Sequence, residues 1–160
     1  MAETPGLWRR AKAFARYSAL RQKLATPLLV IALGLARAMV LTFPFRVYAP
    51  LLGELADDNR ATAEPTRKDA NRARRIGKVI ETVAQFTPWS SNCLAQAIVA
   101  SLCLRVLGIA YSVHFGVARK EGGGPRMEAH SWVMVGEHPV TGFEESVGMT
   151  CLRTFRLEPS

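Results

Sequence analysis

Cys93 and the polar residues before it are the part of the sequence best suited to chemistry. Residues 88–107 read PWSSNCLAQAIVASLCLRVL, a polar start followed by a run rich in Ala, Leu, Ile and Val. This pattern predicts a helix that Ser90 or Ser91 caps and that Gly108 ends. Cys93 then lies in the first turn, where unpaired amides and the helix dipole favour the thiolate, which is the attacking form. The competing interpretation is a buried cysteine that only fills apolar space.

A cysteine nucleophile needs a base close by in space, usually a histidine on another element. The sequence offers three histidines. His138 falls in a predicted turn, where an exposed loop residue is expected, and His114 lies on the polar face of a predicted strand, as an ordinary surface residue would. His130 opens the next predicted strand, directly after a glycine-rich loop. A helix that starts with Cys93 and packs on a sheet that carries His130 would be the papain-type arrangement of nucleophile and base.

The first half of the chain is predicted to be helical. Residues 5–25 have apolar positions at helical spacing among basic residues, so this helix either exposes a solvated face or lies on an anionic membrane or an acidic partner. Residues 27–44 are the most apolar segment. Because Gly34 and Arg37 sit inside it, we expect a buried core helix and not a membrane span. Residues 68–86 have the pattern of an amphipathic helix.

The second half is predicted to consist mainly of strands. After Gly108 the pattern changes to an alternation of apolar and polar residues. A short helix at 45–55 and a polar linker at 56–67 are expected earlier in the chain, and the expected strands span residues 110–118, 128–135, 140–143 and 150–157. Helices followed by antiparallel strands predict an α+β fold. We expect one domain over residues 1–160, with a basic helical part at 1–67 and the catalytic core at 68–160.

Charge and cysteine content narrow the classes of function. Residues 1–80 hold fifteen Lys and Arg against six Asp and Glu, whereas residues 81–160 hold six against seven. A basic half of this kind suits an acidic peptide, a protein partner or a membrane surface; nucleic acid is not expected, since no reading motif accompanies the charge. Three widely spaced cysteines give neither a disulfide framework nor a metal signature, and no secretory signal is visible. We therefore expect a cytoplasmic protein without metal or cofactor.

Three short motifs carry a resemblance to a known family. They are WSSNCL at 89–94, VHFGV at 113–117 and AHSWV at 129–133. In this order they resemble the transglutaminase-like leader peptidases of lasso-peptide biosynthesis, the stand-alone B-type proteases, which are similar to the carboxy-terminal domain of the microcin-processing B protein. The motif-level match covers residues 85–145, and the amino-terminal half resembles the family in length and character only.

The resemblance implies a fold, an activity and a set of partners. The core at 68–160 would be papain- or transglutaminase-like, with the Cys93 helix packed on a small antiparallel sheet. The activity would be a cysteine peptidase that removes the leader from a ribosomally made precursor, with Cys93 as nucleophile and His130 as base. A separate small protein would capture the leader, and a cyclase would then close the ring on the freed amine.

The third catalytic position departs from the family pattern. The family has an Asp about a dozen residues after the His, but no Asp follows Asp69 here, and position 142 is Gly. Either Glu144 substitutes through its longer side chain or the backbone orients His130 unaided; Glu137, in a predicted turn, is a poorer choice.

The oxyanion would be held by the Cys93 amide, with Gln85 or the Trp89 indole as candidate side-chain donors. Trp89 would serve equally well as a packing residue against the strands. Cys103 is expected in the core, and Cys151 has no evident partner. Two alternatives to a peptidase stay open. One is a Cys/His acyl transferase or deamidase, and the other is a basic helical module that binds a membrane or a partner without catalysis.

Overall fold

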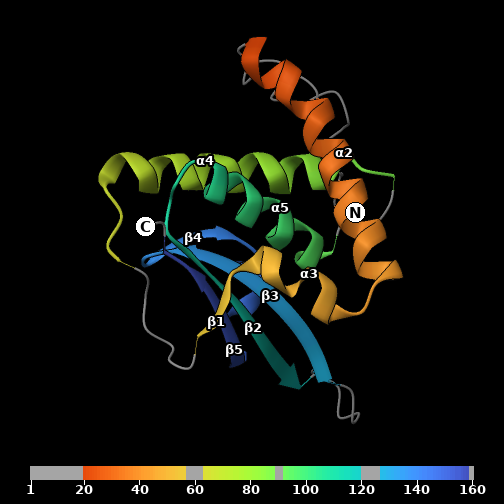
Figure 1. Ribbon diagram of the computed structural model, residues 1–160, viewed down its shortest axis with the longest axis vertical. Helices are drawn as coiled ribbons and strands as arrows, with labels where there is room; N and C mark the ends of the chain where they lie inside the picture. The colour runs from red at the N-terminus through yellow and green to blue at the C-terminus, as the bar shows by residue number, and fades with distance from the viewer. Residues whose placement is uncertain (1–19, 57–62, 89–91, 120–126, 159–160) are drawn as a thin grey trace, which may run out of the picture.

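The computed structural model describes residues 20–56, 63–88, 92–119 and 127–158, and within these ranges the side chains from residue 26 onward except that of residue 119 (Figure 1). The helix expected at residues 5–25 therefore lies outside the described residues except for its last part. The described helices are α2 (Leu20–Thr42), α3 (Phe45–Leu52), α4 (Arg67–Ala84) and α5 (Cys93–Val106), and the strands are β1 (Glu54–Ala56), β2 (Tyr111–Arg119), β3 (Met127–Val135), β4 (His138–Thr141) and β5 (Thr150–Leu157).

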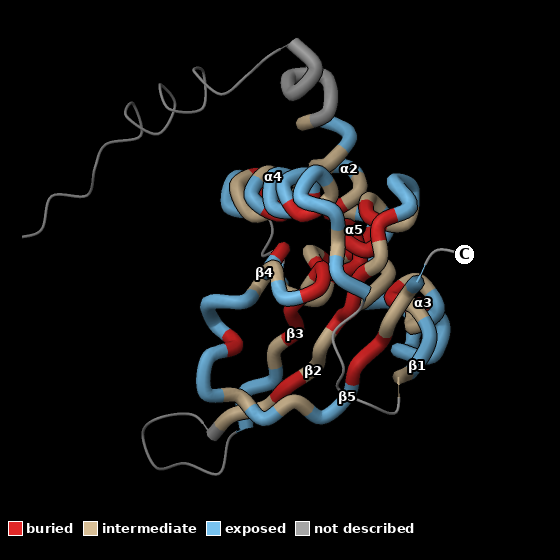
Figure 2. Tube along the Cα trace, turned by 90° about the vertical axis from the view of Figure 1, so that its left-hand side faces the viewer, coloured by how far each residue is buried: buried red, intermediate tan, exposed pale blue. Residues whose placement is uncertain are grey.

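Helix α5 is the centre of the fold. Its sequence is apolar on all sides, and a helix of that kind is stable only when other elements surround it. It contacts α2, α3 and α4 on one side and strands β2, β3 and β4 on the other. Figure 2 shows the buried residues concentrated in α5 and in the strand segments that face it. The members of α5 that are buried are Ala95, Ala97, Ile98, Val99, Ala100, Ser101 and Leu104.

The end of α5 is fixed by Gly108, as the sequence predicts. Gly108 has φ +65°, a conformation that a residue with a Cβ rarely adopts. Its N–H donates to the carbonyl of Arg105 at 3.1 Å, and the N–H of Ile109 donates to the carbonyl of Leu104 at 3.0 Å. This pair of bonds is the Schellman motif, which satisfies carbonyls at the helix end and turns the chain into β2.

Helix α2 differs from the buried core helix expected at residues 27–44. It begins earlier and runs through Pro27. Leu33 and Ala36 are buried in the core, but Leu28 and Ile31 are more than half exposed. The reason is position: α2 lies on the outside of the helical layer and buries only the stripe that packs on α4 and α5. Within the described residues, no helix combines the length and the apolar character that crossing a membrane requires.

The strands form one antiparallel sheet in the order β1-β5-β2-β3-β4. All four strands expected after Gly108 are present, and the α+β fold is confirmed. Strand β1 was not expected, because its residues fall at the end of the short helix expected at 45–55 and the start of the linker expected at 56–67. It forms by pairing with β5. Gly53, at φ +124°, allows this approach, since a Cβ there would lie 2.6 Å from the carbonyl oxygen of Arg156.

Candidate active site

Cys93 is the first residue of α5, as expected from the sequence. The cap is Asn92, not Ser90 or Ser91: the Asn92 side-chain oxygen accepts a hydrogen bond from the Ala95 amide at 3.1 Å. Asn92 takes this role because it directly precedes the first helical residue; Ser90 and Ser91 lie outside the described residues. The amide of Cys93 is one of the helix-start N–H groups that no carbonyl of the helix can reach, so it adds to the positive end of the dipole.

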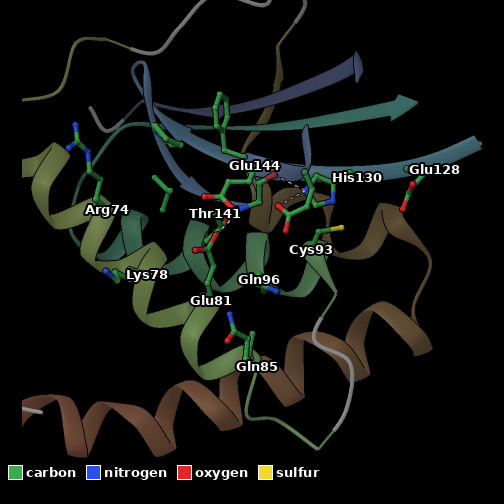
Figure 3. A pocket seen from close by; sticks show the side chains of 17 residues that line it. Arg74, Lys78, Glu81, Gln85, Cys93, Gln96, Glu128, His130, Thr141 and Glu144 are labelled. Atoms are coloured by element: carbon green, nitrogen blue, oxygen red, sulfur yellow. Dashed lines mark hydrogen bonds and ion pairs between the residues drawn. The ribbon is translucent and has the colours of Figure 1, made fainter. Parts of the chain in front are cut away.

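A pocket of about 990 Å³ holds Cys93 and His130 together. Figure 3 shows the Cys93 side chain, from the start of α5, beside the His130 ring, from β3. Both residues are half-buried. The same pocket is lined by residues of α4, by Pro139, Val140 and Thr141 of β4 and by the residues that follow β4.

The ring of His130 is held by a backbone carbonyl. Its Nε2 lies 2.7 Å from the carbonyl oxygen of Gly142. A carbonyl oxygen can only accept a hydrogen bond, so Nε2 carries the proton in the neutral ring. Nδ1 is then the unprotonated nitrogen of the neutral ring and can act as a proton acceptor. This is the tautomer that a general base needs.

Glu144 and Glu145 both line the pocket, from the 3-10 helix Glu144–Ser146. Among the described residues, the carboxylate nearest to His130 is that of Glu145, at 3.9 Å from Nε2. Among the same described residues, no hydrogen bond or ion pair joins Glu144 to His130. Because the Glu145 side chain is 68 % exposed, its ion pair with a protonated His130 is weak. The shortest contact of the ring is therefore with the backbone.

Glycine at position 142 is required by this geometry. Its φ is +69°, and a Cβ added there would lie 2.7 Å from the carbonyl oxygen of Ser131 and 3.0 Å from His130 Nε2. An Asp side chain at this position would collide with the ring that it should orient. The carbonyl of Gly142 thus occupies the place where a third side chain is expected.

Glu81, on α4, also belongs to this site, although sequence reasoning missed it. Its Oε1 accepts a hydrogen bond from the Gly142 amide at 3.1 Å. Burial raises the pKa of Glu81, the bond from Gly142 partly offsets that increase, and the charges of Glu145 and Glu144 raise it further. Glu81 and Gly142 are 61 positions apart, and a contact of this kind gives no signal in local sequence patterns.

The pocket contains one of the two expected oxyanion donors. Gln85, the C-terminal cap of α4, lines the pocket. Trp89 lies outside the described residues. Gln96 also lines the pocket and was not expected. Its position three residues after Cys93 on the same helix places it on the same face, and that spacing could have identified it.

His138 is not the exposed loop residue that the sequence predicts. It begins β4, is half-buried, and its Nδ1 lies 2.8 Å from an Nη of Arg74. Since a guanidinium only donates, Nδ1 accepts and the ring is neutral in this arrangement. The contact ties α4 to β4 at the far end of the pocket from His130.

His114 is also more buried than expected, and it forms a separate cluster away from the pocket. Its ring stacks on Trp132 at 5.4 Å. Its Nε2 lies 2.9 Å from Ser112 Oγ, and its Nδ1 lies 3.1 Å from Thr154 Oγ1. Burial lowers the pKa of His114, and the charge of Arg156 lowers it further. Cys151 has a partner after all, because its Sγ lies 3.9 Å from His114 Nδ1.

Cys103 is the remaining cysteine, and it lies in the core region where the sequence predicts it. Cys103, on α5, packs against the core, and burial raises the pKa of its thiol. In the part of the chain that the structure describes, no three His, Cys, Asp or Glu side chains are placed to hold a metal ion.

Comparison with known proteins identifies the family. The model of the transglutaminase-like superfamily matches residues 39–153, which is most of the chain. Searches of curated proteins and of solved structures gave no significant match. The match begins inside α2 and ends in β5, so it includes both the cysteine helix and the sheet. Such a domain is consistent with cysteine-dependent protease or acyl-transfer activity. The chain belongs to the transglutaminase-like superfamily.

Proposed function

We propose that the protein is a cysteine peptidase that cleaves the leader from a lasso-peptide precursor. The observation that carries the chemistry is the shared pocket of Cys93 and His130, in which the His130 tautomer leaves Nδ1 free to accept a proton. The motifs that resemble the lasso leader peptidases supply the substrate class, and the superfamily match supports a cysteine enzyme.

The reaction begins with proton transfer from Cys93 Sγ to His130 Nδ1. The thiolate is stabilised by the positive end of α5, and the imidazolium is stabilised by the Gly142 carbonyl dipole and by the Glu145 charge at 3.9 Å. The thiolate attacks the carbonyl carbon of the leader–core peptide bond. The oxyanion that forms is placed at the helix start, where the Cys93 amide donates to it and Gln85 stands on the pocket wall.

The intermediate then collapses in two stages. His130 gives its proton to the leaving nitrogen, the C–N bond breaks, and the core peptide departs with a free amine while the leader stays as a thioester on Cys93. Water next attacks the thioester carbon as His130 Nδ1 takes the water proton. The C–S bond breaks, the leader leaves with a carboxyl group, and the thiol is restored.

The shape and charge of the pocket fit an extended peptide. Its volume of about 990 Å³ exceeds what a single side chain needs, and residues of α4 form part of its wall. Arg74 and Lys78 line one part of it, and three carboxylates, Glu128, Glu144 and Glu145, line the part near His130. Under this proposal a small leader-binding protein delivers the precursor, and a cyclase uses the freed amine.

The test is a cleavage assay with a candidate precursor and its leader-binding protein. Mass spectrometry should find hydrolysis at the leader–core junction in the wild type and no hydrolysis in Cys93→Ala or His130→Ala. Omission of the leader-binding protein should slow the cleavage of the full precursor. An intact precursor in every reaction would contradict the proposed function.

The second candidate is acyl transfer or deamidation at the same site. Up to the thioester the chemistry is shared, since an amine can replace water as the second nucleophile. The superfamily match is consistent with either outcome. Product mass separates them, because deamidation or amine exchange leaves the peptide chain unbroken and changes its mass by only a small amount.

A further inference from the structure

The carbonyl of Gly142 holds the His130 ring, but strand pairing does not extend to Gly142 itself. Gly142 follows directly after β4, and β4 pairs with β3 only along Val133–Val135, so on the β4 side of β3 no described strand pairs with His130. A glycine at φ +69° has wide conformational freedom when nothing restrains it. A carbonyl on such a residue orients a ring only if another group fixes the residue.

Helix α4 supplies that restraint at two points. The Glu81 carboxylate accepts the Gly142 N–H at 3.1 Å. One turn earlier, Gly77 lies so close to β4 that a Cβ would overlap the carbonyl of Val140. The close approach at Gly77 keeps Glu81 within reach of Gly142, and Figure 3 shows Glu81 directed from α4 toward the end of β4.

We propose that Glu81 is the positioning residue of this site, and that it fixes the Gly142 carbonyl, which in turn fixes the His130 ring. A carboxylate on α4 and a backbone carbonyl together then perform the task that one side chain after β4 would otherwise perform. The inference rests on the proposed function, because it assigns a role in activating Cys93.

The charge of Glu81 adds to its role as an acceptor. The titratable groups that share its surroundings are Glu144 and Glu145 from the 3-10 helix, His130 from β3, Cys93 from α5 and Lys78 from its own helix. A negative charge beyond Gly142 stabilises a protonated His130 and so favours the thiolate of Cys93. The neighbouring carboxylates and burial raise the pKa of Glu81, so this charge is lost at a higher pH than for a free glutamate.

The variants separate the hydrogen bond from the charge. Glu81→Ala removes both, Glu81→Gln keeps a side-chain carbonyl as acceptor and removes the charge, and Glu81→Asp keeps the charge on a chain too short to reach Gly142. The control is Glu137→Ala, which removes an exposed carboxylate from the turn before β4. The alkylation of Cys93 in these variants can be measured without a peptide substrate.

The readout is the rate at which iodoacetamide alkylates Cys93 between pH 5 and 9. In the wild type, Cys93 should react readily at pH 6. Displacement of a reacting group by about 1 Å costs up to about a hundredfold in rate, so Glu81→Ala and Glu81→Asp should lower the rate at pH 6 by at least about tenfold and move the pH profile toward that of a free thiol. Glu81→Gln should stay within about threefold of the wild type, and Glu137→Ala should match it.

Two results would overturn the inference, and they show whether the role of Glu81 alone fails or the proposed function fails as well. If the wild type reacts at pH 6 and Glu81→Ala or Glu81→Asp reacts equally fast, Glu81 does not position His130, although the proposed function stands. If wild-type Cys93 reacts no faster than Cys103 and Cys151, the proposed function fails, and the role of Glu81 fails with it. Thermal unfolding of each variant identifies any that do not fold; if Glu81→Ala is one of them, the Glu81→Asp and Glu81→Gln pair decides.

Discussion

The molecule contains two cysteine–histidine pairs, and they differ in almost everything except residue type. Cys93 and His130 meet in an open pocket, with the cysteine at a helix start and the histidine held by a carbonyl through Nε2. Cys151 and His114 lie on neighbouring strands, with Sγ and Nδ1 3.9 Å apart, and neither residue lines that pocket.

The surroundings of each histidine explain why the pair in the pocket suits catalysis better. Both ring nitrogens of His114 lie near hydroxyl groups, and burial lowers its pKa, so the imidazolium that a thiolate partner needs is disfavoured. His130 instead has a backbone carbonyl at 2.7 Å and an exposed carboxylate at 3.9 Å from Nε2. A short Cys–His distance is therefore insufficient; the pair also needs a positive helix end at the sulfur and a negative environment behind the ring.

The largest expected difference lies in the two cysteines. Loss of a nucleophile typically removes at least about a thousandfold of activity, so Cys93→Ala should abolish leader cleavage. Cys151→Ala should change the rate by no more than about twofold, as for a substitution away from the site. Single-turnover cleavage of the precursor measures both. Equal losses in the two variants would remove the distinction between the pairs.

Substitution of His130 should reduce activity, whereas substitution of His114 should reduce stability. His130→Ala removes the proposed general base and should lower kcat/KM by about 10²- to 10⁴-fold, with little effect on the unfolding midpoint. His114→Ala should leave cleavage nearly unchanged but cost about 1–3 kcal/mol of unfolding free energy, because it removes the stacking on Trp132 and leaves buried hydroxyl groups without their partner. Kinetics and urea unfolding on the same samples give both numbers. A loss of activity in His114→Ala with unchanged stability would contradict the assignment.

Gly142 and Gly148 provide a matched comparison within one loop. Both have positive φ, at +69° and +83°, so an alanine at either costs about 1–2 kcal/mol of stability. Only at Gly142 would the new Cβ also meet Ser131 and His130, since nothing lies within 4 Å of a Cβ at Gly148. Gly142→Ala should therefore slow alkylation of Cys93, and Gly148→Ala should not. Chemical unfolding and labelling check the two effects separately, and equal labelling rates would show that contact with Gly142 is unimportant.

The smallest expected effect concerns stability against pH. The folded-state pKa of His114 is lowered, so below about pH 6.5 the unfolded chain binds a proton that the folded chain resists. The unfolding free energy should thus fall as the pH drops from about 6.5 to the folded-state pKa of His114. His114→Gln should show a smaller decline over that window. The raised pKa of Glu81 has the opposite effect on the unfolding free energy as the pH falls. Because Glu81 is present in both proteins, its contribution cancels when their curves are compared. Parallel pH curves for the two proteins would count against the buried, neutral His114.

Much of the fold could be predicted because it depends on local patterns. The apolar run after Cys93 predicts α5, Gly108 predicts its end, and the alternation from Tyr111 onward predicts the strands. Strand β1 could not be predicted, since three residues carry no periodicity and the strand exists only through pairing with β5.

The candidate site divides in the same way. Cys93 and His130 stand in recognisable local contexts, and both line the same pocket. The two groups behind His130 have no such local context. One is the backbone carbonyl of Gly142, which no residue type marks in the sequence, and the other is Glu81, which reaches Gly142 from α4. A search for a carboxylate soon after His130 leads to Glu144, whereas the glycine at position 142 signals that the backbone itself makes the contact.

The central claim is that Cys93 is an activated thiolate paired with His130, and competitive alkylation of the folded wild-type protein tests it most directly. Brief treatment with iodoacetamide at pH 6 and at pH 8, followed by peptide mapping, compares all three cysteines in one sample. Cys93 should be labelled rapidly at both pH values, and Cys103, whose thiol pKa is raised by burial, and Cys151 should be labelled slowly. Equal labelling of the three cysteines, or labelling of Cys93 only at pH 8, would contradict it.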